Sequence, residues 1–232
     1  ITATHPGSAN WALAAMSSLM KHAEALGLRS EDSNPCRGLR RRKSGFEAHY
    51  LTDDEFVGLG RALDDAESAH PVAIAALRFV LYTGARKSEA LRLRWEHVHD
   101  DRAVLPDSKT GPRTIWLASP ACAVLAAQPR HPDCPWVFAS RGGGPVTVDK
   151  AWHAVRVAVG LPTLRIHDLR HSHAAVAVNG GEGLRVVAGL LGHADIKTTF
   201  GYANLAEGSV FDAANRVSRS LADMLDGGEA DR

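Results

Sequence analysis

The sequence predicts an α+β protein that is mainly helical and carries one small antiparallel sheet. Its composition, with 45% hydrophobic and 23% charged residues, is typical of a globular protein. Apolar residues recur at helical spacing through most of the chain. The period changes to two in "AVLPDSKTGPRTIWLA", residues 103–118, where two short alternating runs flank a turn and predict a β-hairpin.

The chain opens on a predicted helix. In "SANWALAAMSSLMKHAEALGL", residues 8–28, one face collects Trp11, Ala15, Leu19 and Ala23. Residues 1–45 hold too few partners to bury this face, so we expect the chain to begin partway through a helical N-terminal domain. Proline, glycine and charged residues in "NPCRGLRRRKSGFEAHY", residues 34–50, predict a linker. The expected domains are therefore residues 1–45 and 46–232.

The second domain shows clear helix boundaries. Thr52 and Glu55 form a capping-box pattern, which predicts a helix start. Pro71 begins the next helix, which Gly84 ends, and "ARKSEALRLRW", residues 85–95, predicts a further helix. Helical spacing returns from residue 119 onward, interrupted by the glycine-rich loop "SRGGGPVT", residues 140–147. A C-terminal helix is predicted by the spacing of Val210, Ala213, Ala214, Val217 and Leu221.

Charge is unevenly distributed along the chain. The net charge of +1 predicts no nucleic-acid partner by itself. The linker nevertheless holds a basic cluster, consisting of Arg37, Arg40, Arg41, Arg42 and Lys43. This cluster fits either a solvated linker or a segment that lies along DNA phosphates.

Cysteine usage and hydropathy suggest the cellular compartment. Cys36, Cys122 and Cys134 lie far apart without a CxxC pair, which argues against a disulfide framework or a cysteine zinc site. No apolar run is long enough to span a bilayer, and no signal peptide opens the chain. We expect a cytoplasmic protein of bacterial or phage origin that is associated with the nucleoid and not with a membrane.

The segment "RIHDLRHSHAAVAV", residues 165–178, places polar groups at the start of an apolar helix. One face of that helix holds His167, Arg170 and His171, while its remaining perimeter is largely apolar. A guanidinium there needs a partner, because an unpaired buried charge is costly. The partner can be an anion from outside the protein, such as a phosphate or a carboxylate.

Three alternatives to an external anion stay open for this segment. Arg170 can bind backbone carbonyls beside satisfied core histidines. His167 and His171, four residues apart, have a spacing that suits zinc, although the glutamate of an HExxH motif is missing and Arg170 would repel a cation. The segment can also be a solvated turn, which its apolar neighbours disfavour.

Five motifs then occur in order: "YTGARKSEALRLRW", "SKTG", "HDLRHS", "LLGH" and "TTFGY". With these motifs the sequence resembles the tyrosine recombinases, the phage-integrase family, over nearly the whole chain. The resemblance implies a mainly helical catalytic domain with a small antiparallel sheet, preceded by the end of a helical core-binding domain. It implies six catalytic residues, namely Arg86, Lys109, His167, Arg170, His193 and Tyr202. Glu89 resembles an acidic residue that orients Arg86, and His171 agrees with a common family pattern without a defined direct role.

The resemblance implies a metal- and ATP-independent reaction without a cofactor. The two arginines would hold the non-bridging oxygens of a DNA phosphodiester and stabilise the transition state. Tyr202 would attack phosphorus to form a 3′-phosphotyrosyl link, with His167 as its base. The sequence departs from many relatives at Gly201 and at Asn204, beside the nucleophile.

Lys109 would protonate the departing 5′ oxygen, and His193 would donate a hydrogen bond to the phosphate. The implied partner is double-stranded DNA, contacted in part by Arg40, Arg41, Arg42 and Lys43. The protein is expected to be a monomer when free and a homo-tetramer on synapsed DNA sites. Two alternatives are a non-catalytic DNA-binding relative of the same fold and a histidine-dependent metalloenzyme.

Overall fold

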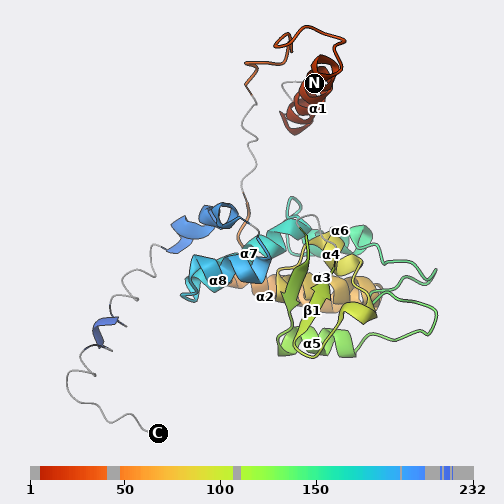
Figure 1. The fold of residues 1–232 in the computed structure, drawn as a ribbon. Helices are drawn as coiled ribbons and strands as arrows, with labels where there is room; N and C mark the ends of the chain where they lie inside the picture. The colour runs from red at the N-terminus through yellow and green to blue at the C-terminus, as the bar shows by residue number, and fades with distance from the viewer. Residues whose placement is uncertain are drawn as a thin grey trace. The chain divides into compact units, whose positions relative to one another are not determined.

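A computed structural model describes residues 6–40, 48–106, 111–193, 195–206, 215, 217–219 and 221. The chain divides into two units, residues 1–47 and 48–232 (Figure 1). This division lies close to the boundary that the linker composition predicts. The assignment of the first unit to a core-binding domain stays a prediction, and the linker residues Arg41, Arg42 and Lys43 lie outside the described residues.

The first unit contains helix α1, Pro6–Ala25, as the apolar spacing predicts. The helix ends where Gly27 takes a left-handed conformation with φ of 70°, and Leu28 N–H donates to the carbonyl of Ala23 at 3.0 Å. Within this unit, Trp11 and Leu19 are exposed. Arg40, the described member of the predicted DNA-binding group, is exposed as well.

The second unit is mainly helical with one two-stranded antiparallel sheet, which confirms the predicted fold class. Strand β1, Arg102–Leu105, pairs with β2, Arg113–Trp116, and Arg102 lies opposite Trp116. The helices are α2 Asp53–Glu67, α3 Pro71–Thr83, α4 Lys87–Leu91, α5 Ser119–Ala126, α6 Asp149–Ala158, α7 Ile166–Asn179 and α8 Leu184–Leu191. The described residues of this unit also include two 3₁₀ segments, η1 Trp95–His97 and η2 Ile196–Ala206.

Helix α4 is shorter than the sequence predicts. The expected helix covered residues 85–95, but α4 stops at Leu91. Beyond it, Val137 N–H donates to the Leu93 carbonyl and Trp95 N–H donates to the Pro135 carbonyl, both at 2.9 Å. This pairing with residues 135–137 satisfies the backbone groups that a longer helix would have used, and it buries Leu93 completely.

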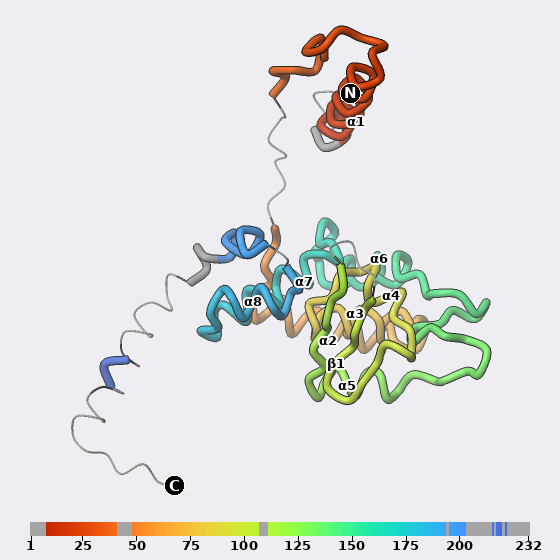
Figure 2. The backbone as a smooth tube through the Cα atoms, viewed as in Figure 1, coloured from red at the N-terminus to blue at the C-terminus, as the bar shows by residue number. Residues whose placement is uncertain are grey.

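Among the described residues, two hydrophobic clusters hold the second unit together. The larger one surrounds α3, which packs against α2, α5 and α7 and places Phe79 with its ring centroid 5.5 Å from that of Phe138. The smaller one lies where α7, α8 and η2 meet (Figure 2). Tyr202 belongs to this smaller cluster, so the packing of three elements determines the position of its ring.

Gly84 ends α3 in a tightly packed turn. It adopts a left-handed conformation with φ of 61°, and its N–H donates to the Val80 carbonyl at 2.9 Å. A Cβ atom at this position would lie 2.8 Å from Cδ2 of His173, so a side chain would displace the imidazole. The turn therefore brings the chain that leads to α4 directly against α7.

Two further expectations concern the C-terminal region and hydropathy. Most of the predicted C-terminal helix lies outside the described residues, and residues 215, 217–219 and 221 are helical. Val217 and Leu221 are exposed. In the described part of the chain, no helix combines the length and apolar character that a membrane span requires.

The capping box of α2 gives a first test of the fold. The Glu55 N–H donates to Oγ1 of Thr52, and the Thr52 N–H donates to Oε2 of Glu55 at 2.9 Å. We expect Thr52→Ala to lower the free energy of unfolding by about 1 kcal/mol, because the cap hydroxyl is lost. Thr52→Ser retains a hydroxyl, so its free energy of unfolding should fall much less. Equal urea midpoints for the two variants would contradict this assignment.

Candidate active site

Arg86 is held in place by Glu89. Arg86 is the N-cap of α4, and its N–H donates to Oε2 of Glu89 at 2.9 Å. Its guanidinium Nη1 donates to Oε1 of the same carboxylate at 2.6 Å. Glu89 is buried, whereas the side chain of Arg86 is 22% exposed. The carboxylate therefore fixes the guanidinium while leaving part of it open to a ligand.

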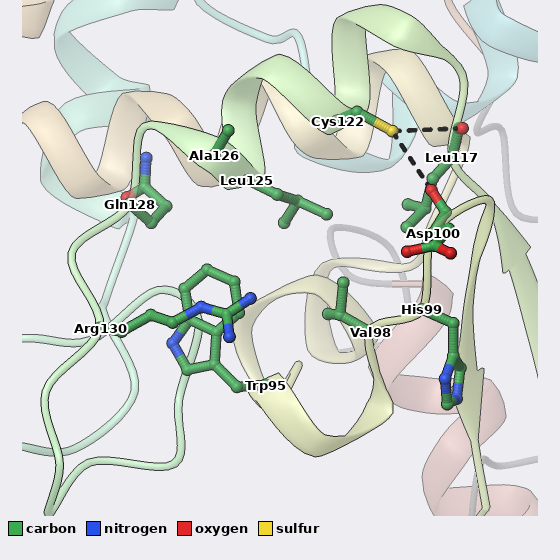
Figure 3. A pocket seen from close by; sticks show the side chains of 10 residues that line it. All are labelled: Trp95, Val98, His99, Asp100, Leu117, Cys122, Leu125, Ala126, Gln128 and Arg130. Atoms are coloured by element: carbon green, nitrogen blue, oxygen red, sulfur yellow. Dashed lines mark hydrogen bonds between the residues drawn. The ribbon is translucent and has the colours of Figure 1, made fainter.

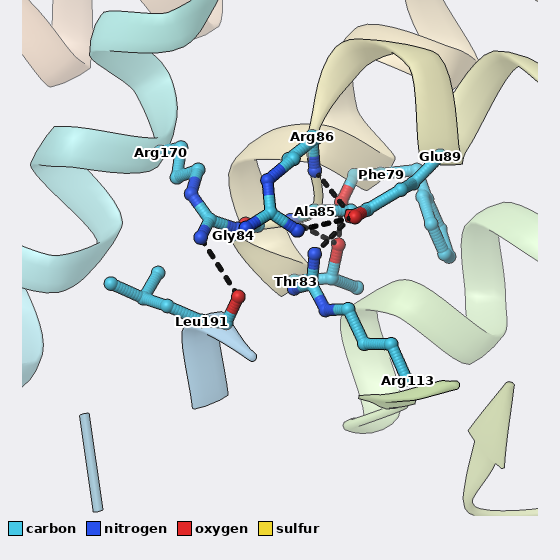
Figure 4. Close-up of polar contacts among 9 residues, drawn as sticks. All are labelled: Phe79, Thr83, Gly84, Ala85, Arg86, Glu89, Arg113, Arg170 and Leu191. Carbon is cyan, nitrogen blue, oxygen red and sulfur yellow. Dashed lines mark hydrogen bonds and ion pairs between the residues drawn. The ribbon is translucent and has the colours of Figure 1, made fainter. Parts of the chain in front are cut away.

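Arg170 is almost completely buried and binds two backbone carbonyls. Nη1 donates to the Gly84 carbonyl at 2.5 Å, and Nη2 donates to the Leu191 carbonyl at 2.8 Å (Figure 4). This is the carbonyl-bound arrangement that the sequence left open as an alternative to an external anion. Asp168 binds Arg165 instead, through bonds of 2.7 and 3.1 Å. The carbonyls accept hydrogen bonds but bring no negative charge, so the positive charge of Arg170 is not neutralised by them.

The positive charges of the site influence one another. Burial, followed by the charges of Arg113 and Arg86, lowers the pKa of Arg170 to about 10. Arg170 therefore stays charged at neutral pH, at an electrostatic cost that an anion would relieve. Figure 4 shows the guanidinium groups of Arg86, Arg113 and Arg170, which come from three different elements, gathered near Glu89.

The hydroxyl of Tyr202 contacts His171. Its oxygen lies 2.7 Å from Nδ1 of His171, whose ring makes an edge contact with that of His167 at a centroid distance of 4.7 Å. The resemblance implied His167 as the base, but the structure places His171 on the hydroxyl. The physical reason is that η2 packs Tyr202 against Ala174 and Val178, which lie one and two turns beyond Arg170 on α7, and His171 is one turn closer to them than His167.

The pKa shifts of this pair suit a neutral hydrogen bond. Burial, followed by the charge of His167, lowers the pKa of His171 to about 4. Burial raises the pKa of the Tyr202 hydroxyl, and the charge of Arg170 opposes that shift. At neutral pH the hydroxyl is therefore protonated and the imidazole beside it is neutral, so the hydroxyl can donate its hydrogen bond to Nδ1.

His193 follows Gly192, the left-handed C-cap of α8. Its Nδ1 lies 2.9 Å from Oγ1 of Thr199, whose side chain is completely buried. Burial, followed by the charges of Arg170 and Arg86, lowers the pKa of His193 to about 4. If the threonine hydroxyl donates to Nδ1, then Nε2 of the neutral ring carries the proton and can donate to a ligand.

The structure brings most of the predicted site residues together. After burial, the positive charges of Arg170 and Arg86 lower the pKa values of both His167 and His193. The charge of Arg170 also opposes the rise in the pKa of Tyr202 that burial causes. A hollow of about 560 Å³ opens beside Arg86 and His167. Lys109 lies outside the described residues, so its predicted role stays a prediction.

Sequence reasoning missed three neighbours of the site. Arg113 binds Glu89, Thr199 holds His193, and Tyr50 makes edge contacts with the rings of His171 and Tyr202 at 6.4 and 6.3 Å. Arg113 could have been noticed, because period-two alternation with Ile115 places it on the inward face of the hairpin. Thr199 lies within the "TTFGY" motif, although its contact with His193 was not foreseen, and Tyr50 carries no comparable signal in the sequence.

A second pocket lies away from these residues. It has a volume of about 320 Å³ and lies between η1 and α5 (Figure 3). Its lining includes Arg130, whose guanidinium lies over the Trp95 ring, 4.1 Å from the ring centroid. None of the predicted site residues lines this pocket.

Comparison with known proteins decides the family. Residues 49–208 match the model of the phage integrase family. The chain belongs to this family of tyrosine recombinases. It is 28% identical over 209 residues to the tyrosine recombinase XerD of Neisseria meningitidis serogroup A, a match that covers 84% of this chain and 71% of XerD.

Solved structures show the same fold. A lambda integrase(75–356) dimer bound to a COC′ core site has a TM-score of 0.66 at 21% identity, covering 85% of this chain and 73% of that one. A lambda integrase tetramer bound to a Holliday junction has a TM-score of 0.63 at 21% identity, covering 83% and 60%. These likenesses confirm the tyrosine recombinase fold.

The contacts of the two histidines of α7 bear on the zinc alternative. In the part of this recombinase that the structure describes, no group of three or more histidine, cysteine or carboxylate side chains is arranged to hold a metal ion. His167 and His171 instead make an edge-to-ring contact, and His171 uses Nδ1 on the Tyr202 hydroxyl.

The lowered histidine pKa values predict acid sensitivity of the fold. Because the folded state disfavours protonated His171 and His193, the unfolded state binds more protons as the pH falls below 6.5. Stability is therefore fully present above pH 6.5 and decreases between pH 6.5 and about 4. We expect the urea midpoint of this recombinase to fall from pH 7.5 to pH 5.

Matched variants identify the histidines that cause this loss. Replacing His171 and His193 together by asparagine should make the drop between pH 7.5 and pH 5 smaller. His131→Asn, at an exposed position, should leave the drop unchanged. An equally large drop in all three proteins would show that other groups cause the acid sensitivity.

Proposed function

We propose that this chain is the catalytic part of a site-specific DNA recombinase that cleaves and rejoins strands through a 3′-phosphotyrosine link at Tyr202. The observation that carries the proposal is the 2.7 Å contact between the Tyr202 hydroxyl and a neutral imidazole, beside a cluster of arginines that lacks enough negative charge. A nucleophile, a proton acceptor and an anion site are the parts that phosphoryl transfer requires.

The charge balance favours a phosphodiester as the ligand. Arg86, Arg113 and Arg170 carry three positive charges, and Glu89 contributes one negative charge among them. A phosphodiester would offset part of this excess, and guanidinium groups match its oxygens geometrically. These side chains provide the charge stabilisation that a metal ion supplies in other phosphoryl-transfer sites, so the proposed reaction uses no metal.

The chemical step follows from the hydrogen bonds. The Tyr202 oxygen forms a bond to phosphorus while the bond from phosphorus to the 5′ oxygen breaks. The Tyr202 proton passes to Nδ1 of His171, and the 5′ oxygen takes up a proton, for which Lys109 is the proposed donor. His193 donates through Nε2 to a non-bridging oxygen. One phosphodiester replaces another, so the reverse step joins a 5′ hydroxyl without ATP.

The proposed partner is double-stranded DNA. Family membership supports this partner, as does the fold shared with lambda integrase, whose solved structures include a dimer on a core site. The tetramer of lambda integrase on a Holliday junction supports a tetramer of this chain on synapsed sites. We propose that Arg40 and the neighbouring Arg41, Arg42 and Lys43 contact DNA phosphates, and that the free protein is a monomer.

A non-catalytic DNA-binding relative is the second candidate. The observation that favours it is the burial of Tyr202, which is 4% exposed in this structure. Under the catalytic proposal, binding of DNA must open η2 enough to expose the hydroxyl. Under the alternative, the tyrosine stays part of the smaller hydrophobic cluster and no covalent product forms.

A covalent trapping experiment separates the two candidates. A duplex carrying the attachment site, nicked just beyond the scissile phosphate, should lose a short strand after attack and leave the protein joined to DNA. We expect wild-type protein to form this adduct and Tyr202→Phe to form none. Arg86→Ala should lower the cleavage rate by about 100-fold or more while DNA affinity falls less.

The control for this experiment is Tyr82→Phe, which removes an exposed hydroxyl elsewhere in the unit. It should form the adduct at the wild-type rate. Tight, sequence-specific DNA binding by wild-type protein without any adduct would support the non-catalytic candidate and overturn the catalytic one.

A further inference from the structure

Arg113 is a buried arginine that adds charge to the site, but no step of the proposed reaction gives it a contact with the substrate. It is the first residue of β2, lies opposite Leu105, and points inward together with Ile115. It is 5% exposed, in a strand position where an apolar residue would be ordinary. Because burial removes the guanidinium from water, a contact within the protein must stabilise its charge.

The partner of Arg113 is the carboxylate that also holds Arg86. Nη1 of Arg113 donates to Oε2 of Glu89, the same oxygen that accepts from the Arg86 N–H. The other oxygen of Glu89 accepts from the Arg86 guanidinium at 2.6 Å. One buried carboxylate thus binds two arginines, and Arg113 restricts the position that Glu89 can offer to Arg86 (Figure 4).

This ion pair is not arranged for stability alone. Nε and Nη2 of Arg113 are buried and have no hydrogen-bond partner among the residues that the structure describes. Burial and the charge of Arg86 lower the pKa of Arg113, and Glu89 only partly opposes this effect. A well-packed apolar residue in place of a buried charge is often neutral or stabilising. A charge retained at such a position points to a role beyond packing.

Arg113 also lies directly against the residue that precedes His193. A Cβ atom on Gly192 would lie 2.3 Å from Nε of Arg113 and 2.7 Å from its Cδ. Gly192 therefore provides the space through which the arginine side chain passes. The same side chain links the hairpin, the carboxylate of α4 and the end of α8.

We propose that Arg113 is a positioning residue of the strand-transfer reaction, which holds Glu89 against Arg86 and thereby keeps the Arg86 guanidinium directed at the phosphate. The proposal rests on the proposed function. In this proposal Arg113 acts through Glu89 and not on the phosphate itself, because Nη1 is bound to Glu89 and the other two guanidinium nitrogen atoms are buried.

A double-mutant cycle tests whether Arg113 acts through Arg86. Arg113→Met keeps much of the side-chain length and removes the charge. At saturating nicked DNA, we expect it to lower the single-turnover cleavage rate at least 30-fold and to change the dissociation constant for DNA less than threefold. In the Arg86→Ala background, Arg113→Met should lower the cleavage rate less than threefold, because the side chain that Arg113 positions is already absent.

Two outcomes of the cycle would overturn the proposal. If the cleavage rate falls equally in both backgrounds, Arg113 acts independently of Arg86. If the rate does not fall in the wild-type background, Glu89 needs no second arginine to position Arg86. If Arg113→Met fails to fold, Arg113→Lys enters the same cycle. Lysine keeps the charge but offers Glu89 a single ammonium instead of a planar fork, so a smaller loss with the same dependence on Arg86 is expected.

A second measurement separates this proposal from the proposed function. Wild-type adduct formation in the same experiment reports on the function itself. The order parameter of the Arg86 Nε–H vector, assigned with Arg86→Lys, reports on positioning without catalysis. Arg113→Met should lower it, while that of Arg78, which pairs with Asp64 and Glu67, should stay unchanged. An unchanged value for Arg86 would overturn the positioning role even if the protein cleaves no DNA.

Discussion

The structure of the site depends on one buried carboxylate surrounded by more positive charge than it can balance. Glu89 binds Arg86 and Arg113, and the charge of Arg170 reaches both arginines. Burial makes this excess costly, and the lowered pKa of Arg170 expresses that cost. An anionic ligand would relieve this cost, and the arginines that would attract it are already held in place by Glu89 and by backbone carbonyls in the folded state.

The arginines of the site also connect the fold. Arg170 joins the end of α3 to the end of α8 through the Gly84 and Leu191 carbonyls, and Arg113 joins the hairpin to α4. Substitutions at these positions therefore affect both stability and chemistry. Tyr202 shows the same coupling, because its ring fills the smaller hydrophobic cluster while its hydroxyl meets His171. Exposure of the nucleophile requires that this packing change.

Local signals in the sequence were sufficient for much of the fold. The capping box at Thr52, the Pro71 start, the Gly84 stop and the hairpin were all predicted and are confirmed. Each depends on neighbouring residues alone. Helix α4 was predicted too long, because its end is set by pairing with residues 135–137, which lie more than forty positions away.

The sequence predicted only those site residues that lie within recognisable motifs. The motifs brought attention to Arg86, Arg170, His193 and Tyr202, which the structure places around one centre. They did not indicate that His171 would meet the hydroxyl, since that contact depends on how η2 packs against α7. The carbonyl partners of Arg170 likewise come from two distant helix ends, which no spacing along the chain reveals.

We infer that the arginine cluster around Glu89 is an anion site that fits a tetrahedral phosphate. Crystals of the protein soaked in tungstate, a tetrahedral oxyanion with a strong anomalous signal, test it most directly. We predict an anomalous peak bound by the Arg86 guanidinium and by Nε2 of His193, within reach of the Tyr202 hydroxyl. Tungstate bound only at exposed arginines such as Arg40, with the cluster around Glu89 unoccupied, would contradict it.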